Sequence, residues 1–243
     1  MVKFFLMKDL MGKAIWDYFH NNHPEDILTE TSVSEQDILP VDYLFRTFAQ
    51  MPPVEQKAME LAHGKVLDVG AAAGAHSIYL QNEKKLDVTA LDVSPLSIEV
   101  CRARGIKKAI CCHLLDFDQG TYDSILMMMN GTGIFENISK ADVYLQKLKS
   151  LLNPGGQILI DSTDIIYMYG NEDGVIMPKY QYYGEIQYYV TYKGEKEDPF
   201  TMLYMDIDTL KKSALKNGFQ VKKILKDDYA FLARLTLNDE ITA

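Results

Sequence analysis

The sequence predicts an α/β fold: a mostly parallel sheet of seven strands with helices on both faces and an antiparallel last strand. Its 243 residues are 47% hydrophobic and include only 8 Pro and 15 Gly, so the chain can bury a substantial core. Between residues 65 and 164, short apolar segments alternate with helical ones, a pattern typical of parallel sheets. Near the C-terminus, two apolar segments flank the polar residues 226–228, which predicts an antiparallel hairpin.

The first 58 residues are expected to form a helical cap ahead of a domain at residues 59–243. Helical patterns lie around Asp9–Phe19 and Val41–Phe48. Pro24 separates them, and Pro52 with Pro53 closes the second, because proline does not continue a helix.

The middle of the chain supplies most of the expected sheet. Its strands are expected at Lys65–Val69, Asp87–Val93, Ala109–Cys112, Tyr122–Met129 and Gln157–Asp161. Helices are expected between them at Ala75–Gln81, Pro95–Arg104 and Ala141–Leu152. Ser94 is a suitable N-cap for the second helix, with Pro95 at its first position.

The pattern changes after Asp164. Residues 165–205 hold nine of the fifteen tyrosines, and the stretches Glu185–Tyr192 and Phe200–Met205 predict an inserted β-hairpin at the rim of the sheet. A helix near Asp208–Lys216 is expected next. The last two strands are expected near Gln220–Leu225 and Tyr229–Thr236.

Composition narrows the function classes. The formal charge of -9 disfavours nucleic acid as a partner, since phosphate backbones would be repelled. The longest apolar run has five residues, against the ~20 of a membrane-spanning helix, so no membrane partner is expected. The odd cysteine count and the lack of a signal-like N-terminus favour a cytoplasmic protein, expected as a monomer or homodimer.

A segment rich in small residues carries the main chemical signal. Strand 65–69 leads through Gly70 and Gly74 into a helix, so backbone could approach a ligand and helix N–H groups could face it. The spacing fits a dinucleotide fingerprint poorly, because alanines stand at its third and sixth positions. Asp92 ends the next strand, where a carboxylate can accept both hydrogen bonds of a ribose diol.

These residues resemble the motifs of class I S-adenosylmethionine-dependent methyltransferases. Asp68, Gly70 and Gly74 match the family's acid and glycine motif, with Ala72 in place of its middle glycine. The segments at 122–129 and 151–160 are similar to the family's fourth strand and to the helix, turn and fifth strand that follow. The resemblance implies a Rossmann-like sheet and S-adenosylmethionine as cofactor, with S-adenosylhomocysteine as product.

The resemblance also implies site residues. The glycine loop would lie along the methionine part of the cofactor, Asp92 would hold the ribose, and Asp116 with Phe117 would frame adenine. Arg46, the only arginine before the motif, is a candidate for binding the cofactor carboxylate or an acidic substrate. The full expected cofactor set is Arg46, Asp68, Gly70, Ala71, Ala72, Gly74, His76, Asp92, Val93, Leu115, Asp116, Phe117, Met129 and Asn130.

Methyl transfer from a sulfonium needs an aligned acceptor, and a general base only for some acceptors. The expected acceptor is a small molecule, because residues 130–133 lack the Asn-Pro-Pro-aromatic motif of base-flipping DNA enzymes. The catalytic residue stays open. Candidates near the acceptor are His20, His23, Tyr43, Asn130, Asp164 and Tyr167, and no metal is expected. The alternatives are an NAD(P)-dependent oxidoreductase and a non-catalytic cofactor-binding module.

Overall fold

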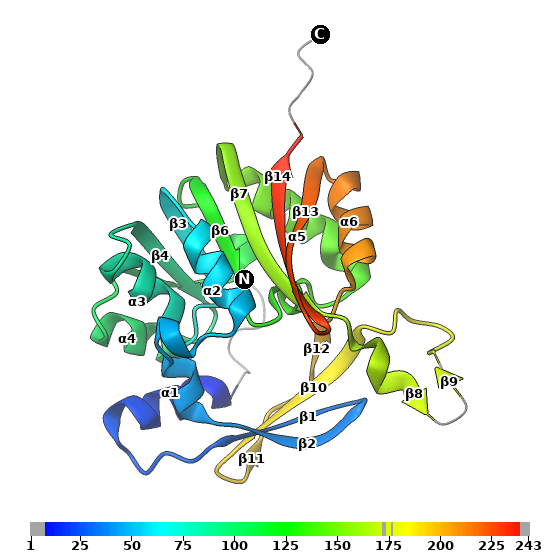
Figure 1. Ribbon diagram of the computed structural model, residues 1–243. Helices are drawn as coiled ribbons and strands as arrows, with labels where there is room; N and C mark the ends of the chain where they lie inside the picture. Colours follow the sequence, from blue (N-terminus) through cyan, green and yellow to red (C-terminus); the bar gives the residue numbers. More distant parts are fainter. Residues whose placement is uncertain (1–7, 172–173, 176, 239–243) are drawn as a thin grey trace.

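The computed structural model describes residues 8–171, 174–175 and 177–238. Residues 1–7 of the expected cap and residues 172, 173 and 176 of the expected insert lie outside these ranges. A large sheet with flanking helices lies above a smaller sheet (Figure 1).

The large sheet confirms the predicted fold class. Its seven strands lie in the order β13-β14-β7-β6-β3-β4-β5. Strands β5, β4, β3, β6 and β7 pair in parallel, whereas β14 runs antiparallel to both β7 and β13. The bounds are β3 (Lys65–Val69), β4 (Asp87–Asp92), β5 (Lys108–Cys111), β6 (Tyr122–Met127), β7 (Leu152–Thr163), β13 (Phe219–Asp227) and β14 (Ala230–Leu237).

Helices cover both faces of this sheet because its strands are apolar on both sides. In β3, Val66 packs in a hydrophobic cluster with α2, while Leu67 and Val69 pack in the cluster that contains α5 and α6. Successive side chains of a strand point to opposite faces, so one short apolar segment supports two helix layers. The helices are α2 (Pro53–Leu61), α3 (Ala75–Asn82), α4 (Pro95–Ala103), α5 (Ile138–Ser150) and α6 (Ile207–Lys216).

The smaller sheet corrects the expectation of a purely helical cap. It is built from β1 (Ile27–Thr31), β2 (Ser34–Leu39), β10 (Glu185–Tyr192), β11 (Glu195–Lys196) and β12 (Phe200–Leu203). The expected hairpin of the insert is present, but its strand β10 also pairs antiparallel with β1. Strand β2 was not predicted, because it is polar and exposed over most of its length and pairs only with β1.

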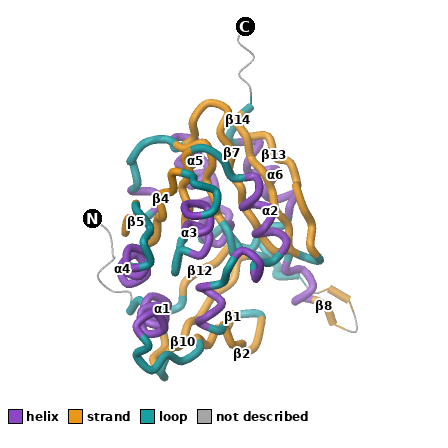
Figure 2. Tube along the Cα trace, turned by 60° about the vertical axis from the view of Figure 1, so that its left-hand side comes forward, coloured by secondary structure: helices purple, strands orange, loops and turns teal. Residues whose placement is uncertain are grey.

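The expected N-terminal helices are present in altered form. Helix α1 spans Leu10–His20 and lies beside α4, as Figure 2 shows. The expected helix at 41–48 is two short 3-10 helices, η2 (Val41–Phe45) and η3 (Phe48–Gln50). Pro52 is the N-cap of α2 and Pro53 is its first residue, so the proline pair lies where the second 3-10 helix has ended and α2 begins.

Short elements complete the description. The 3-10 helices η4 (Leu114–Asp116), η5 (Gly131–Phe135) and η6 (Ile165–Tyr169) follow β5, β6 and β7, and β8 (Gly170–Asn171) pairs with β9 (Gly174–Val175). Within the described part of the chain, no helix has the length and apolar character needed to cross a membrane.

Candidate active site

The loop between β3 and α3 has the backbone shape that its small residues predict. Gly70 and Gly74 adopt φ of 77° and 79°, and Ala72 also has a positive φ of 48°. A Cβ atom at Gly74 would overlap the side chain of Ile106, so glycine is required there for conformation and for space. The loop therefore presents backbone closely to whatever lies above it.

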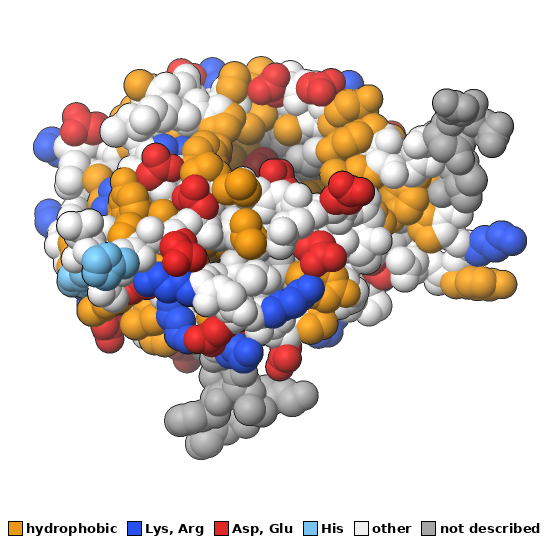
Figure 3. Space-filling view, turned by 90° about the horizontal axis from the view of Figure 1, so that it is seen from below, with side chains coloured by type: hydrophobic (Ala, Val, Ile, Leu, Met, Phe, Trp, Pro, Cys, Tyr) orange, Lys and Arg blue, Asp and Glu red, His pale blue; other side chains and the backbone are white. Residues whose placement is uncertain are grey.

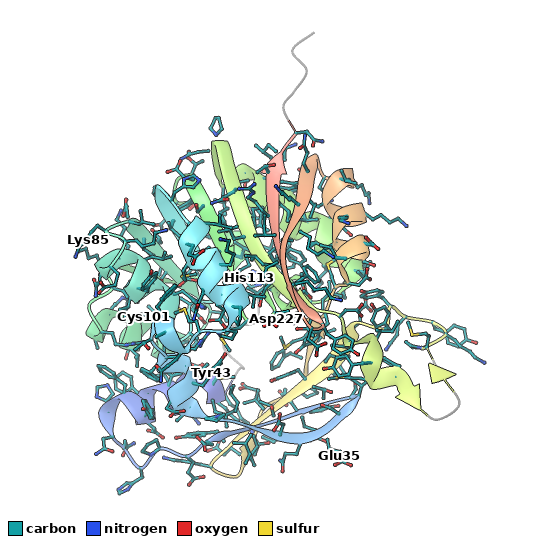
Figure 4. All side chains as sticks on the ribbon, in the orientation of Figure 1. Glu35, Tyr43, Lys85, Cys101, His113 and Asp227 are labelled. Atoms are coloured by element: carbon teal, nitrogen blue, oxygen red, sulfur yellow. The ribbon has the colours of Figure 1, made fainter. Side chains whose placement is uncertain are left out.

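Buried polar contacts hold this loop from below. Asp68 accepts a hydrogen bond from Ser77 Oγ at 2.6 Å and is almost fully buried. The thiol of Cys101, labelled in Figure 4, donates to the Ala72 carbonyl at 3.2 Å. Burial raises the pKa of this thiol to about 12, so it stays protonated. Asp68 and Cys101 thus position the loop from the side of the core.

Asp92, at the end of β4, joins the loop to the start of α4. Its Oδ2 accepts from the Ala72 amide at 2.8 Å, and its Oδ1 accepts from the Ser94 amide at 2.9 Å. Burial raises the pKa of Asp92, and these two amides oppose the rise. A carboxylate has about four acceptor positions, so the held carboxylate can still accept from a ligand diol.

A cavity of about 400 Å³ lies beside Asp92 at the carboxyl ends of β4 and β5. Its lining includes two of the expected cofactor residues, Val93 and Asp116. Six further lining residues were missed by sequence reasoning: Asp9, Ser94, Pro95, Cys111, Cys112 and His113. The volume falls in the range of small-ligand pockets, and both apolar surface and polar groups are present. Asp92 and the glycine loop do not themselves line this cavity.

Phe117 requires a correction. Its ring is buried in the hydrophobic core, 6.3 Å between ring centroids from Tyr122, and it is not among the residues that line the cavity. The neighbouring Leu115 packs partly against the same core. The polar end of η4, Asp116, faces the cavity instead, so the acid and its aromatic neighbour point to different sides.

Arg46 is also placed differently from the expectation. Its Nε donates to Glu55 Oε2 at 3.0 Å, and His76 Nε2 lies 2.8 Å from the same oxygen. All three residues are at least 94% buried. The guanidinium is therefore already engaged by a buried carboxylate, which was not among the expected site residues. Its Nη1 donates to the Tyr43 carbonyl at 2.9 Å, and its Nη2 lies 3.4 Å from His76 Nε2.

A second cluster of polar residues lies at the carboxyl ends of β6 and β7. Met129 and Asn130 both adopt left-handed backbone, with φ of 63° and 61°. Strain of this kind in non-glycine residues often accompanies functional sites. The turn directs the Gly131 amide to Asp161 Oδ1 at 2.9 Å. Asp161, the last residue of a segment predicted as a strand, was missed as a site residue.

The charge of Asp161 acts on two tyrosines, Tyr43 and Tyr204. Burial, and then the charges of Glu55 and Asp161, raise the pKa of Tyr43, which stands between the two sheets in Figure 4. Burial and nearby Tyr188, Tyr167 and Asp161 also raise the pKa of Tyr204. Both phenols therefore stay neutral near pH 7, and Tyr167 belongs to the same neighbourhood although its side chain is 44% exposed.

The insert is fastened directly over these strand ends. Thr132 Oγ1 donates to the Leu203 carbonyl at 2.8 Å and lies 2.8 Å from Ser162 Oγ. The Met205 amide donates to Ser162 Oγ at 3.0 Å. These contacts are buried, so the end of β12 has a fixed position above β6 and β7.

Two other substrate candidates, His20 and Asp164, do not join the group around Asp161. His20 lies at the far end of α1, and Asp164 already accepts hydrogen bonds from other residues. His20 ends α1, about 15 Å of helix away from Asp9, and its ring contacts Trp16 in a tilted arrangement, with centroids 4.1 Å apart. Asp164 caps η6 and accepts from Tyr183 Oη at 2.7 Å. The structure thus gives His20 and Asp164 structural contacts, and it brings Tyr43 and Asn130 together with Asp161. His23 has a left-handed backbone in the turn after α1.

Comparison with known proteins agrees with this geometry. Residues 66–156 match the family model of a methyltransferase domain. An S-adenosylmethionine-dependent methyltransferase from Bacteroides fragilis, solved with S-adenosylhomocysteine, is 42% identical with a TM-score of 0.87 and coverage of 95% of both chains. The CcbJ methyltransferase from Streptomyces caelestis has a TM-score of 0.61 at 12% identity, with 79% of this chain and 99% of that chain covered. Among curated proteins none matches this sequence.

A further similar structure is CalS10 from Micromonospora echinaspora, an amino pentose methyltransferase with S-adenosylmethionine bound. It has a TM-score of 0.55 at 12% identity and covers 79% of this chain and 94% of that chain. At 12% identity, these last two structures show only that the fold is shared.

The sheet order, the glycine loop and the cavity define a cofactor-dependent transferase of the class I methyltransferase fold. Given 42% identity over nearly the whole chain, the protein belongs to the S-adenosylmethionine-dependent methyltransferases, which confirms the resemblance in the sequence. Its cofactor is S-adenosylmethionine, which supplies an activated methyl group. The oxidoreductase and non-catalytic alternatives receive no support from these relatives. Across the described residues, no group of three or more His, Cys, Asp or Glu side chains is placed to hold a metal ion.

Proposed function

We propose that this methyltransferase acts on a small-molecule acceptor bound between the carboxyl ends of β6 and β7 and the smaller sheet. The observation that carries this proposal is the position of Asp161, Tyr43 and Asn130 at one place beneath the insert. In Figure 3 the molecule is hollowed on the face seen from below, and hydrophobic side chains border the hollow. A recess of this type suits a compact ligand.

The cofactor would occupy the remaining part of the site. Asp92 would accept hydrogen bonds from its ribose, Val93 and Asp116 would frame its base, and the Gly70–Gly74 loop would lie along its amino-acid part. The chain's contribution to catalysis is then mainly to align the acceptor and exclude water, because the methyl group is already activated. Residues 8–58 and the insert at 165–205 would together form the cover of the acceptor.

Surface charge supports a small acceptor over nucleic acid. Acidic and basic side chains are interspersed on the face shown in Figure 3, and the whole chain carries a formal charge of -9. We propose a cytoplasmic location, supported by the free thiols of Cys101, Cys111 and Cys112, and a monomeric or homodimeric state. Sedimentation equilibrium with and without S-adenosylhomocysteine would establish the oligomeric state.

The function is tested with an isotopically labelled methyl donor and a metabolite extract. The proposal predicts label in a small molecule that passes an ultrafiltration membrane. Label found only in the retained protein or nucleic acid would contradict it. Boiled enzyme is the control for non-enzymatic methylation.

A further inference from the structure

We propose that the methyl acceptor is a small basic amine and that Asp161 takes a proton from its nitrogen before the methyl group is transferred. This inference rests on the proposed small-molecule function and specifies the chemistry of the acceptor. It starts from the position and contacts of one buried carboxylate.

Asp161 lies near the carboxyl end of β7, on the same face of the strand as Leu159, which packs with α2. Its side chain is 8% exposed. One oxygen accepts from the Gly131 amide at 2.9 Å, and the Asn130 amide also faces the carboxylate. Within the described ranges, no side chain donates a hydrogen bond to it. The carboxylate is thus held by backbone and left available to an external donor.

The charges around Asp161 are unbalanced. Glu55, whose charge raises the pKa of Asp161, is already paired with Arg46 and His76. Asp161 itself forms no ion pair with a Lys, Arg or His of the described chain. A buried carboxylate without a cation is unfavourable, and a cationic ligand would supply the missing charge. An amine, protonated at neutral pH, provides it, whereas an alcohol does not.

The neighbouring rings favour the same ligand. Tyr43 from η2 and Tyr204 after β12 both stand near the Asp161 charge and stay neutral. Ammonium groups are attracted to the faces of aromatic rings, by about 0.5–2 kcal/mol in other proteins. A carboxylate among phenol rings therefore matches an amine with an apolar body.

Asp161 also has the acidity that a proton acceptor needs. Burial raises its pKa to about 6, against the opposing effect of the two amides, with smaller contributions from Glu55 and His76. The titratable groups coupled to it by charge are Tyr43 from η2, Glu55 from α2, His76 from α3 and Tyr204. A base with a pKa near the working pH is ionised and still able to hold a proton during the reaction.

The proposed step balances as follows. An N–H bond of the ammonium breaks, and its proton passes to a carboxylate oxygen of Asp161. The freed nitrogen lone pair forms a bond to the methyl carbon while the carbon–sulfur bond breaks, leaving that electron pair on sulfur. The products are a methylated ammonium and S-adenosylhomocysteine, and Asp161 then releases the proton to water.

Binding of matched probes tests the acceptor chemistry without knowledge of the natural substrate. In the presence of S-adenosylhomocysteine, benzylamine should raise the melting temperature of the wild-type protein, and benzyl alcohol should not. Asp161→Asn should abolish the benzylamine response. Asp87→Asn is the matched control, because Asp87 lies at the opposite end of the parallel sheet and pairs with Lys108 on the surface. Equal responses to the two probes, or an undiminished response in Asp161→Asn, would overturn the inference.

The same variant separates proton transfer from folding and cofactor binding. With the labelled donor and a metabolite extract, the labelled product should be retained on a cation exchanger and carry an N-methyl group. Asp161→Asn should slow its formation by about 100-fold or more, within the usual 10²–10⁴ range for a general base, with S-adenosylhomocysteine affinity unchanged. A labelled neutral ether would refute the amine. Label confined to macromolecules would instead contradict the proposed function. The benzylamine binding experiment does not depend on that result and tests the amine inference separately.

Discussion

Asp161 is both buried and ionised at neutral pH, and this combination destabilises the folded protein. Its pKa is about 6 in the fold, against 3.8 for a free Asp side chain. A carboxyl whose folded pKa is raised weakens the fold as pH rises from about 4 to 6, and the loss persists above that range. The hydrogen bond from the Gly131 amide offsets only part of the cost of burying the Asp161 charge, so this residue lowers the free energy of unfolding.

Asp161→Asn should therefore stabilise the protein at pH 8. The shift of about two pKa units corresponds to a gain on the order of 2–3 kcal/mol, provided the Asn oxygen keeps the Gly131 hydrogen bond. Urea unfolding of both proteins at pH 8 and pH 4 measures this difference. A gain that is equally large at pH 4 would show that ionisation of Asp161 is not the cause.

Asp92→Ala should weaken S-adenosylhomocysteine binding. The variant loses the acceptor for the ribose and the contacts to the Ala72 and Ser94 amides, so the expected loss is roughly 1–3 kcal/mol, or about 5- to 150-fold in Kd. Isothermal titration calorimetry measures it. Asp87→Ala, at the other end of β4, is the control, and equal affinities of the two variants would refute the role of Asp92.

Glu55→Gln should destabilise the protein by about 3–5 kcal/mol at pH 7, because Arg46 would keep a buried, unpaired charge. Burial would raise the pKa of Glu55, but the hydrogen bond from His76 and the charges of His76 and Arg46 outweigh it and lower the pKa below 4.5. Such a group stabilises the fold above its unfolded pKa and loses this effect as pH falls. The difference from wild type in urea unfolding should therefore shrink below about pH 4.

The sequence was informative for residues that act through local backbone. Gly70 and Gly74 follow one strand end and Asp92 ends the next strand, in a recognisable order, and the glycines adopt the left-handed backbone that such a loop needs. The contact of Arg46 with Glu55 was not predictable, because Glu55 lies on another element and looks like an ordinary helix residue in the sequence. Asp161 carries no local pattern, since its function depends on a turn thirty positions earlier in the chain.

At the scale of elements, two helix starts meet at the cofactor cavity. Asp9 caps α1, and its Oδ2 accepts from Ser94 Oγ at 3.0 Å. Ser94 in turn caps α4 by accepting from the Ser97 amide at 3.0 Å. Glu197, which follows β11, accepts from the amides of Asp9 and Leu10, so the smaller sheet is joined to this place as well.

Asp9→Ala should loosen this junction. Loss of an N-cap typically reduces stability by about 0.5–2 kcal/mol, and loss of the Ser94 contact should also weaken S-adenosylhomocysteine binding. Thermal unfolding with and without the ligand measures both effects. Asp42→Ala, at an exposed position in η2, is the control, and identical ligand-induced shifts in Asp9→Ala and wild type would show that α1 does not support the cavity.

The elements of the large sheet were predictable because their apolar segments and caps are local. Ser94 and Pro95 begin α4 as expected. The smaller sheet was only half predictable, because β1 pairs with β10 from a segment more than 150 residues away. Its strand β2 is too polar and exposed to show an alternating pattern.

In the molecule as a whole, the two sheets contribute different parts of the site. The large sheet holds the cofactor cavity between β4, β5 and α1, and the ends of β6 and β7 face the smaller sheet with Asp161 and its tyrosines. Different elements would thus bind the cofactor and the acceptor, and the reacting atoms of the two ligands would lie next to each other above Asn130. A mixed-charge surface and a fixed attachment of the insert agree with a small ligand enclosed between the sheets.

A crystal structure of the complex with S-adenosylhomocysteine and benzylamine tests the account most directly. We expect the ribose on Asp92, the base between Val93 and Asp116, and the amine nitrogen between the sulfur and the Asp161 carboxylate. A cofactor whose sulfur points away from β6 and β7, or an amine bound without contact to Asp161, would contradict the account.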